Sequence, residues 1–374
     1  MEEKKFDLKA ILNADLSELF KKKPSSSAKQ VKKAKPISKP VLSFDFGSES
    51  IKVIEGRYVN GQLKISNCFS IEHEGLIEDG RMVDAKLLSQ LIKDQLQQRK
   101  IKTKNAICTL NSTQIINREL FVPIVEADEL DTVVRYEIQQ FLPINLVDYL
   151  IQYVILDEVE MNNQKRLKLN VVTFPEKMAK SYYELLKEVG LKPYALDVSY
   201  NALSKLANHS KLLEEVTDVE GTVAFVDMGA QSIDLNIFTN GNVQFTRLIK
   251  SGGVIIDERL NQLPDMSIKS AASLNNADLA GNEIISQILR VSVDEMMYEL
   301  ERVLQFYRNK SVGNKIDHLF ILGGCSNLKN LEAYMSEKLS IRTTQIKNLN
   351  HVELPDNLTE VHEYTTAIGA MIRL

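Results

Sequence analysis

A short pattern that occurs twice constrains the fold of this chain more than any other feature of its sequence. The first copy lies in Val41 to Glu55, VLSFDFGSESIKVIE, and the second in Val223 to Leu235, VAFVDMGAQSIDL. In both copies an apolar run ends in aspartate, a glycine follows after one intervening residue, and a Ser-Ile pair resumes an extended pattern. This order predicts two strands joined by a tight turn. Each copy then reaches an Asn-Gly dipeptide, Asn60-Gly61 and Asn240-Gly241, which favours a further hairpin turn.

The residues of the first turn suit phosphate and a cation. Gly47 can adopt backbone angles closed to other residues, so the N–H groups of the turn can point at an anion. Ser48 and Ser50 add hydroxyl donors, and Asp45 can hold a cation through water. One such turn is common in ordinary β-hairpins, so a single copy leaves a purely structural interpretation open. Two copies instead predict two similar lobes that face one ligand, as the two sides of a nucleotide cleft.

Length and composition fit two lobes and argue against several classes of protein. The chain has 374 residues, of which 44% are hydrophobic and 26% are charged, as in a globular protein with a sizeable core. No apolar run is long enough to cross a bilayer, and the charged start excludes a secretory signal. The three cysteines have no C-x-x-C spacing and the five histidines form no ligand pair, which argues against zinc or disulfides and for a reducing cytoplasm. The formal net charge of −4 argues against a nucleic-acid partner.

Residues 1–40 differ from the rest of the chain. Residues 21–40 hold eight lysines and no acidic residue, a composition that predicts a flexible tether. An amphipathic helix followed by lysines can lie on an anionic membrane, dock in a partner's groove, or pack on its own domain, and the sequence leaves all three open. The helix is predicted at Phe6 to Phe20, where one face carries Leu8, Ile11, Leu12, Leu16, Leu19 and Phe20.

The region between the two copies has the pattern of a small α+β unit inserted into the first lobe. Before it, a helix starts at the cap residue Asp84, with Leu87, Leu88, Leu91, Ile92 and Leu96 as its buried stripe. Further strands are predicted at Lys64–His73, Ala106–Leu110, Ile115–Val122, Ile151–Val159, Arg166–Phe174 and Leu191–Val198, and helices at Glu126–Leu142, Pro175–Gly190 and Ser199–Leu213.

The second half adds two glycine turns. The hairpin strands run to about Ile249, and Ser251, Gly252 and Gly253 then open a helix through Leu263. Such glycines let a backbone approach phosphate, although a simple strand–helix turn has the same composition. A buried strand ends at Gly323-Gly324, where a flat ring can lie against the backbone. The remaining expectations are a long core helix after Asn282 that includes Ile284 and Phe306, a helix capped by Ser326, and a final helix at Thr365–Leu374.

With DFGSESIK, DMGAQS, SGG and LFILGGCSNL in this order, the chain resembles the actin, Hsp70 and sugar-kinase superfamily. Within it, the resemblance is to the PilM family of type IV pilus assembly proteins, relatives of the division protein FtsA. The likeness runs from Val41 to Leu374 and includes RELFVP followed by RYEIQQFLPINLVDYLIQYVIL, and also LLKEVGLKPYALDV and LERVLQFYRN. It implies an α/β, two-lobed actin-like (ribonuclease H-like) fold with a small α+β insert in lobe one.

The resemblance and the element pattern together divide the chain into four parts. The first is the helix and tether at 1–40. Lobe one comprises 41–104 with 185–220 and 360–374, the insert comprises 105–184, and lobe two comprises 221–359.

The resemblance implies that ATP with magnesium lies in the cleft. Asp45 and Asp227 would face magnesium through water. The nucleotide would be bound by the first loop, Gly47, Ser48, Glu49, Ser50 and Lys52, and by the second, Gly229, Ala230, Gln231 and Ser232. Gly252 and Gly253 would line the nucleotide, and Gly323, Gly324 and Cys325 would line the adenosine.

The sequence departs from the pattern in two places. In LDVSYNAL, Ser199 and Tyr200 stand where the superfamily often has an acidic residue and a proline, and that acid helps to position the attacking water. A serine cannot act as a general base at neutral pH without a partner, so Asp197, two residues away, is the substitute candidate. The sequence therefore predicts ATP binding with weak or no ATPase activity. Asn275 stands where PilM-like chains often have lysine, which leaves the ribose and adenine contacts open.

The function implied by the resemblance is that of a cytoplasmic scaffold at the inner face of the cytoplasmic membrane. PilM-like proteins bind the N-terminal tail of the membrane protein PilN and link the inner-membrane platform to the pilus motor. Residues 1–40 would add a peripheral membrane contact. Two alternatives stay open, namely a small-molecule kinase of the same superfamily and an FtsA-like division filament protein.

Overall fold

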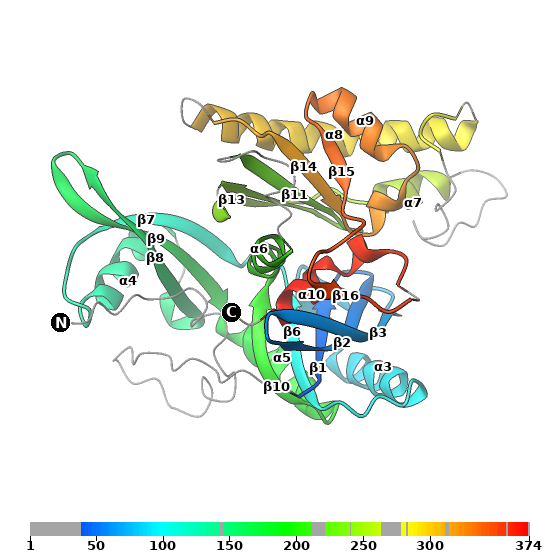
Figure 1. Ribbon diagram of the computed structural model, residues 1–374, viewed down its shortest axis with the longest axis horizontal. Helices are drawn as coiled ribbons and strands as arrows, with labels where there is room; N and C mark the ends of the chain where they lie inside the picture. The colour runs from blue at the N-terminus through cyan, green and yellow to red at the C-terminus, as the bar shows by residue number, and fades with distance from the viewer. Residues whose placement is uncertain are drawn as a thin grey trace.

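The computed structural model describes residues 39–142, 145–210, 221–239, 241–262, 278–281, 283–310, 314–356 and 358–372. The expected helix at Phe6–Phe20, nearly all of the lysine-rich segment, Asn240 and Asn275 lie outside these ranges. Figure 1 shows two lobes, each built on a sheet, and a smaller unit that projects from one of them.

Lobe one is built on a mixed sheet with the strand order β10-β6-β1-β2-β3-β16. Strands β1, β2 and β3 form an antiparallel meander, and β6 and β10 run parallel to β1. Parallel neighbours need crossover connections, which here contain helices packed on one face of the sheet. The strands are β1 (Val41–Phe46), β2 (Ser50–Val59), β3 (Gln62–Glu72), β6 (Asn105–Leu110), β10 (Lys192–Val198) and β16 (Val352–Glu353).

Lobe two repeats this arrangement with the strand order β13-β12-β11-β14-β15. Here too three antiparallel strands come first and two parallel strands follow. Each copy of the sequence pattern therefore occupies the first hairpin of its own sheet, and the predicted two-lobed α/β fold is confirmed. The strands are β11 (Thr222–Met228), β12 (Ile233–Thr239), β13 (Asn242–Ile249), β14 (His318–Leu322) and β15 (Thr343–Gln345).

Two helices between the sheets join the lobes. Figure 1 shows α6 (Ser199–His209) and α10 (Thr365–Met371) in this position. One hydrophobic core contains residues of both helices together with Val41 and Ile54 of lobe one and Val223 and Phe225 of lobe two. The lobes are thus held together by shared packing, which keeps their first hairpins close to each other.

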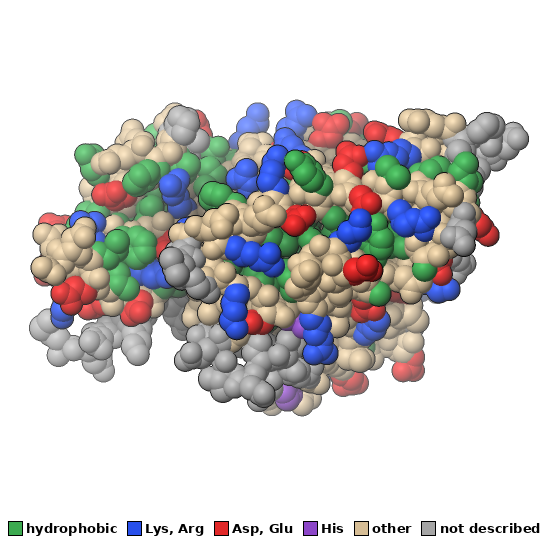
Figure 2. Space-filling view, turned by 90° about the horizontal axis from the view of Figure 1, so that it is seen from above, with side chains coloured by type: hydrophobic (Ala, Val, Ile, Leu, Met, Phe, Trp, Pro, Cys, Tyr) green, Lys and Arg blue, Asp and Glu red, His purple; other side chains and the backbone are tan. Residues whose placement is uncertain are grey.

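The outer face of lobe two is covered by α7 (Val254–Leu260), α8 (Ile284–Lys310) and α9 (Leu331–Leu339). Two apolar residues that were expected in the core, Ile284 and Phe306, are instead 61% and 62% exposed on α8. Figure 2 shows acidic, basic and hydrophobic side chains interspersed on the face seen from above. None of the helices in the described part of the chain is both long and apolar enough to span a membrane.

Two helices cover the outer face of the lobe one sheet, α3 (Ala85–Gln98) and α5 (Glu176–Glu188). The predicted cap of α3 is confirmed, because the Asp84 carboxylate accepts hydrogen bonds from the N–H groups of Lys86 and Leu87. The predicted buried stripe is correct for Leu88, Ile92 and Leu96 but wrong for Leu87, which is 54% exposed beside the cap.

The insert is smaller than residues 105–184. Its sheet has the order β7-β9-β8, and α4 packs on it around Val134 and Ile138. Strand β6 lies outside it because β6 pairs with β1 and β10 in the middle of the lobe one sheet. Helix α5 lies outside it because Tyr182 and Leu186 are fully buried in the core of lobe one. The elements of the insert are β7 (Ile116–Pro123), α4 (Leu130–Phe141), η1 (Leu146–Asp148), β8 (Tyr149–Met161) and β9 (Gln164–Pro175).

Several element ends differ from the sequence-based expectation. Ser326 does not cap α9, because its hydroxyl donates to Gly323 O and the helix begins after Asn330. The chain returns to lobe one at β16, earlier than residue 360, since β16 pairs with β3. The remaining short elements are β4 (Ile77–Glu78), β5 (Arg81–Met82), η3 (Gly324–Asn327) and η4 (Val361–Glu363).

Candidate functional site

The two copies of the pattern form turns with the same backbone hydrogen bond. The Gly47 N–H donates to Ser50 O over 3.1 Å, and the Gly229 N–H donates to Ser232 O over 3.0 Å. A Cβ atom on Gly47 would lie 2.8 Å from Ser50 O, so a side chain there would displace the turn. The sequence repeat therefore corresponds to a structural repeat at atomic detail.

The same amide groups are free in both turns. In the described part of the chain, the N–H groups of Ser48 and Glu49 donate no hydrogen bond, and neither do those of Ala230 and Gln231. Consecutive free N–H groups at a turn form a concave site that favours an anion. Each lobe thus offers such a site beside an aspartate.

Three aspartates of the two hairpins, Asp45, Asp227 and Asp234, interact electrostatically and form an acidic cluster. Asp45 comes from lobe one, while Asp227 and Asp234 are opposite residues on β11 and β12 of lobe two. Burial and the charge of Asp227 raise the pKa of Asp45 to about 8. Burial also raises the pKa of Asp227 to about 6 and that of Asp234 to about 7. The two hairpins therefore bring together three carboxyl groups whose charged form is disfavoured, because nearby cations do not offset the effect of burial.

The carboxylates fit a hydrated divalent cation. The cation that lowers the pKa values of both Asp45 and Asp227 is Lys52, and its ammonium group is already bonded to Glu363. Within the described ranges, no three His, Cys, Asp or Glu side chains lie close enough together to hold a metal ion. Mg²⁺ commonly takes one or two carboxylates and completes its shell with water and phosphate. Asp45 and Asp227 suit that kind of site.

The glycine segments of lobe two converge on the second turn. The N–H groups of Gly253 and Val254 donate to the carbonyl oxygens of Gly229 and Ala230 over 3.1 and 2.9 Å. The Cys325 thiol donates to Gly229 O over 3.3 Å. Segments that are far apart in the sequence therefore meet at one place, as the motif order implied.

Glycine is required at two of these positions. A side chain on Gly252 would overlap the backbone of Gly229 and Ala230. Gly323 has φ +83°, and a side chain there would overlap the Asp227 carboxylate. At Gly324, by contrast, an added Cβ would meet open space. The backbone at the end of β14 thus passes close to Asp227 and leaves room on its other side.

The first turn of lobe one lies near α7 of lobe two. The Gly47 carbonyl is hydrogen-bonded to His73 Nε2 over 3.0 Å, and the His73 N–H donates to Glu49 O over 3.1 Å. Burial and the charge of Glu49 raise the pKa of Asp257 on α7. These contacts fix the first turn to β3 and place a second pair of acidic groups at the cleft.

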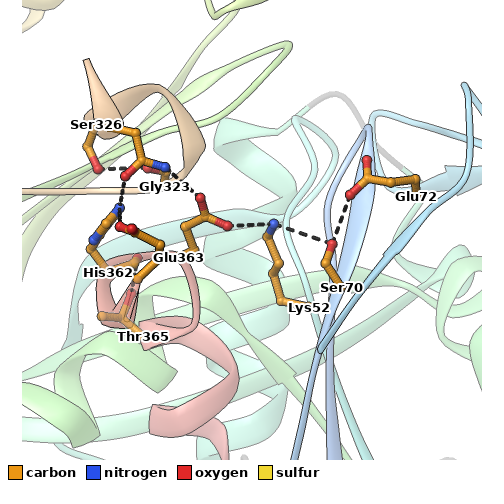
Figure 3. Close-up of polar contacts among 10 residues, drawn as sticks. Lys52, Ser70, Glu72, Gly323, Ser326, His362, Glu363 and Thr365 are labelled. Carbon is orange, nitrogen blue, oxygen red and sulfur yellow. Dashed lines mark hydrogen bonds and ion pairs between the residues drawn. The ribbon is translucent and has the colours of Figure 1, made fainter. Parts of the chain in front are cut away.

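Lys52 lies between the acidic cluster and the end of the chain. Its Nζ atom is 2.8 Å from Glu363 Oε2 and 3.4 Å from Ser70 Oγ, as Figure 3 shows. Burial raises the pKa of Glu363, but the charge of Lys52 and the hydrogen bond from Lys52 outweigh it, so the pKa is lowered. In this state the Lys52 ammonium is held by Glu363, beside the position where the resemblance places phosphate.

Asp197, the sequence-based candidate for a catalytic base, is fully buried and fully bonded. One carboxylate oxygen accepts from the Val198 N–H and the Asn201 amide over 2.9 and 2.7 Å. The other oxygen accepts from Lys205 Nζ over 2.6 Å. Both oxygens are thus engaged, and the arrangement ties β10 to α6 rather than presenting a free base.

A cavity of about 540 Å³ lies between the base of the insert and lobe two. Asp234 and the fully buried Asn236 form part of its wall. Its charged lining residues also include Arg247, Lys250, Glu299 and Arg302.

Sequence reasoning missed Asp234 and Glu363. Asp234 could have been found, because it follows Asp227 by the same number of residues as Lys52 follows Asp45. No motif marks Glu363, which is 311 positions from Lys52 in the chain.

Comparisons with known proteins agree with this geometry. The model of a protein family described as type IV pilus assembly protein PilM matches residues 43–373. A solved PilM-PilN type IV pilus biogenesis complex has a chain that is similar with a TM-score of 0.76 and 20% identity, over 90% of this chain and 99% of that one. The ethanolamine utilization protein EutJ from Carboxydothermus hydrogenoformans is similar with a TM-score of 0.51 and 12% identity, over 90% and 92%.

Among curated proteins, the cell division protein FtsA of Buchnera aphidicola subsp. Schizaphis graminum (strain Sg) is 22% identical over 89% of this chain and 90% of its own length. The structural likenesses confirm the actin-like fold, and the family match covers most of the chain. The chain therefore belongs to the PilM family of type IV pilus assembly proteins.

Proposed function

We propose that this protein is an ATP-binding scaffold of type IV pilus assembly. The observation that supports this most strongly is the pair of matched turns, each with two free N–H groups beside an aspartate. One nucleotide between them would satisfy the donors of both lobes, and a magnesium ion would balance the carboxylates.

The proposed contacts are those that the resemblance to the family implies. Asp45 and Asp227 would hold magnesium through water, and the ion would neutralise charge on the phosphates. The phosphates would be bound by Gly47, Ser48, Glu49, Ser50 and Lys52 and by Gly229, Ala230, Gln231 and Ser232. The rest of the nucleotide would lie along Gly252 and Gly253, with the adenosine at Gly323, Gly324 and Cys325.

Calorimetric titration of the full chain with ATP tests this proposal. Binding should require the ion, so the affinity should be at least about tenfold higher in Mg²⁺ than in excess EDTA. Equal affinities in the two buffers would contradict the proposed role of the aspartates. Absence of ATP binding in both buffers would contradict the proposal that the protein binds nucleotide.

We propose further that ATP hydrolysis is slow. The buried network around Asp197 supports this, because it occupies the one base candidate that the sequence offered. A steady-state turnover on the order of 1 s⁻¹ or more that is lost in Asp45→Ala would contradict slow hydrolysis.

The partner proposed for this chain is the N-terminal tail of PilN, with which the scaffold would link the inner-membrane platform to the motor. Support comes from the likeness to a chain of a solved PilM-PilN complex. Residues 1–40 would add a peripheral contact with the inner face of the cytoplasmic membrane, through their lysines. Co-purification with a PilN tail peptide, with and without ATP, tests the partner. Flotation with anionic liposomes, before and after removal of residues 1–40, tests the membrane contact.

A further inference from the structure

Glu363 is bonded through both carboxylate oxygens to groups on different lobes. Oε2 accepts from Lys52 of β2 over 2.8 Å, and Oε1 accepts from the amide of Asn327 in η3 over 2.6 Å. The Lys52 and Glu363 side chains are only 19% and 17% exposed, so solvent and salt screen this pair less than a surface pair. One side chain near the end of the chain thus bridges the lobes.

The bridge continues to the loop expected to hold adenosine. His362 Nε2 is hydrogen-bonded to the side-chain oxygen Oδ1 of Asn327 over 2.6 Å, and the Gly323 N–H donates to His362 O over 3.2 Å. Burial lowers the pKa of His362 to about 4, so at neutral pH its ring is uncharged and donates to the amide as a neutral group. Figure 3 shows Glu363 between Lys52 on one side and His362 and Gly323 on the other.

A phosphate at the first turn would compete with Glu363 for Lys52. Lys52 lies directly opposite Asp45 on β1, so its side chain starts beside the turn that offers free N–H groups. An ammonium group is a compact charge on a flexible stem, and it can exchange one anionic partner for another. A nucleotide with its phosphates offers more negative charge than one carboxylate does.

We propose that Glu363 is a positioning residue that holds Lys52 away from phosphate in the nucleotide-free protein. Arrival of the phosphates transfers Lys52 from the carboxylate to a phosphate oxygen, and Glu363 then loses its contact with β2. The loop 323–327 is thereby released from β2. This inference rests on the proposed nucleotide binding and adds a coupling between the phosphate end and the adenosine end of the cleft.

The first test is the affinity of the full chain for Mg²⁺-ATP in Glu363→Gln. Glutamine keeps the shape and can still accept from Asn327, but it no longer competes for Lys52 as a charge. Binding should become about three- to tenfold tighter, as expected for loss of one partly buried ion pair. Glu72→Gln is the matched control, because Glu72 accepts from Ser70 Oγ and has no bond to Lys52. Equal or weaker binding by Glu363→Gln, or the same gain in Glu72→Gln, would overturn the inference.

The second test needs no nucleotide. Amide hydrogen exchange of residues 323–327 should be faster in Lys52→Gln than in the wild type. The substitution removes the ion pair between Lys52 and Glu363, and the loop that Glu363 contacts through Asn327 then becomes less stable. Lys64→Gln, which removes an exposed ion pair with Glu353 on the same sheet, should leave this exchange unchanged. Unchanged exchange in Lys52→Gln would overturn the coupling. Failure of the wild type to bind nucleotide would overturn the proposed function itself, whereas binding without a gain in Glu363→Gln overturns only the role of Glu363.

Discussion

The turns of the two lobes have the same backbone hydrogen bond but differ in the charge of the side chains beside them. Both are closed by a glycine N–H that donates to a serine carbonyl, and both follow an aspartate. The residue opposite that aspartate on the next strand is Lys52 in lobe one and Asp234 in lobe two. The repeated pattern thus sets the geometry of the site, while one residue in each copy sets its electrostatics.

This difference gives the lobes unlike tasks. Lobe one can approach phosphate with a side-chain cation as well as with backbone N–H groups. Lobe two offers N–H groups and a pair of carboxylates, which suit a hydrated cation. Asp45, Asp227 and Asp234 lower the stability of the folded protein when they are charged, because burying carboxylates close together disfavours their charged form.

The largest expected effect is loss of nucleotide affinity when a cation-facing aspartate is neutralised. Asp45→Asn and Asp227→Asn should each weaken Mg²⁺-ATP binding about 10- to 100-fold in calorimetric titration, because the charge that holds the ion is removed. Asp356→Asn, on the surface, is the control. A wild-type affinity in both site variants would show that neither lobe uses its aspartate.

The second expected effect is a dependence of stability on pH. In the folded protein, burial raises the pKa of Asp45 to about 8 and the pKa of Asp234 to about 7, from the ordinary value of 3.8. Between these values the folded state holds protons that the unfolded state has released, so this contribution to stability falls as pH rises from about 4 to 8. The slope is at most about 1.4 kcal/mol per pH unit for each group.

The thermal midpoint of the nucleotide-free protein, measured at pH 5 and pH 8, tests this dependence. Asp45→Asn removes one titrating group, so its midpoint relative to the wild type should rise with pH. A difference that is constant over this range would mean that Asp45 titrates normally in the folded state.

A smaller change in folding stability is expected at Lys52 and Asp234, the matched positions of the two lobes, and it should be opposite in sign. Asp234→Asn should stabilise the nucleotide-free protein by about 1–2 kcal/mol, because it removes a buried charge with no cation of its own. Lys52→Gln should destabilise it by about 1–2 kcal/mol, because it leaves Glu363 without its partner. Thermal or denaturant unfolding measures both. Changes of the same sign would break the comparison between the lobes.

The smallest effect is expected at the edge of the cleft. Asp257→Asn should raise stability by only about 0.5 kcal/mol or less, since Asp257 is partly exposed and solvent screens its repulsion from Glu49. A gain as large as that of Asp234→Asn would show that the acids at α7 are as poorly solvated as those of the hairpins.

Local signals in the sequence were sufficient for the two matched turns and for most of the elements. The turn at Gly47, the cap Asp84 and the glycines at Gly323 are each determined by neighbouring residues, and the structure has them where the pattern placed them. The repeat then predicted the second lobe, because the same local chemistry occurs twice.

What the sequence did not reveal depends on contacts between distant segments. The place of β6 follows from parallel pairing with β1 and β10, which no local pattern specifies. The partner of Lys52 is Glu363, 311 positions away near the end of the chain. The engagement of Asp197 by Lys205 spans only eight positions, but it depends on how α6 packs after β10. Charge balance in the cleft is likewise a property of the assembled lobes and not of either motif.

The central claim is that both turns close on one nucleotide. Amide hydrogen exchange of the full chain with and without Mg²⁺-ATP tests it most directly, read at residues 47–52 and at residues 229–234. The account predicts that nucleotide slows exchange in both segments, and that at one subsaturating nucleotide concentration Asp45→Asn lowers the protection of both. Protection of only one segment, or of neither at saturating nucleotide, would contradict it.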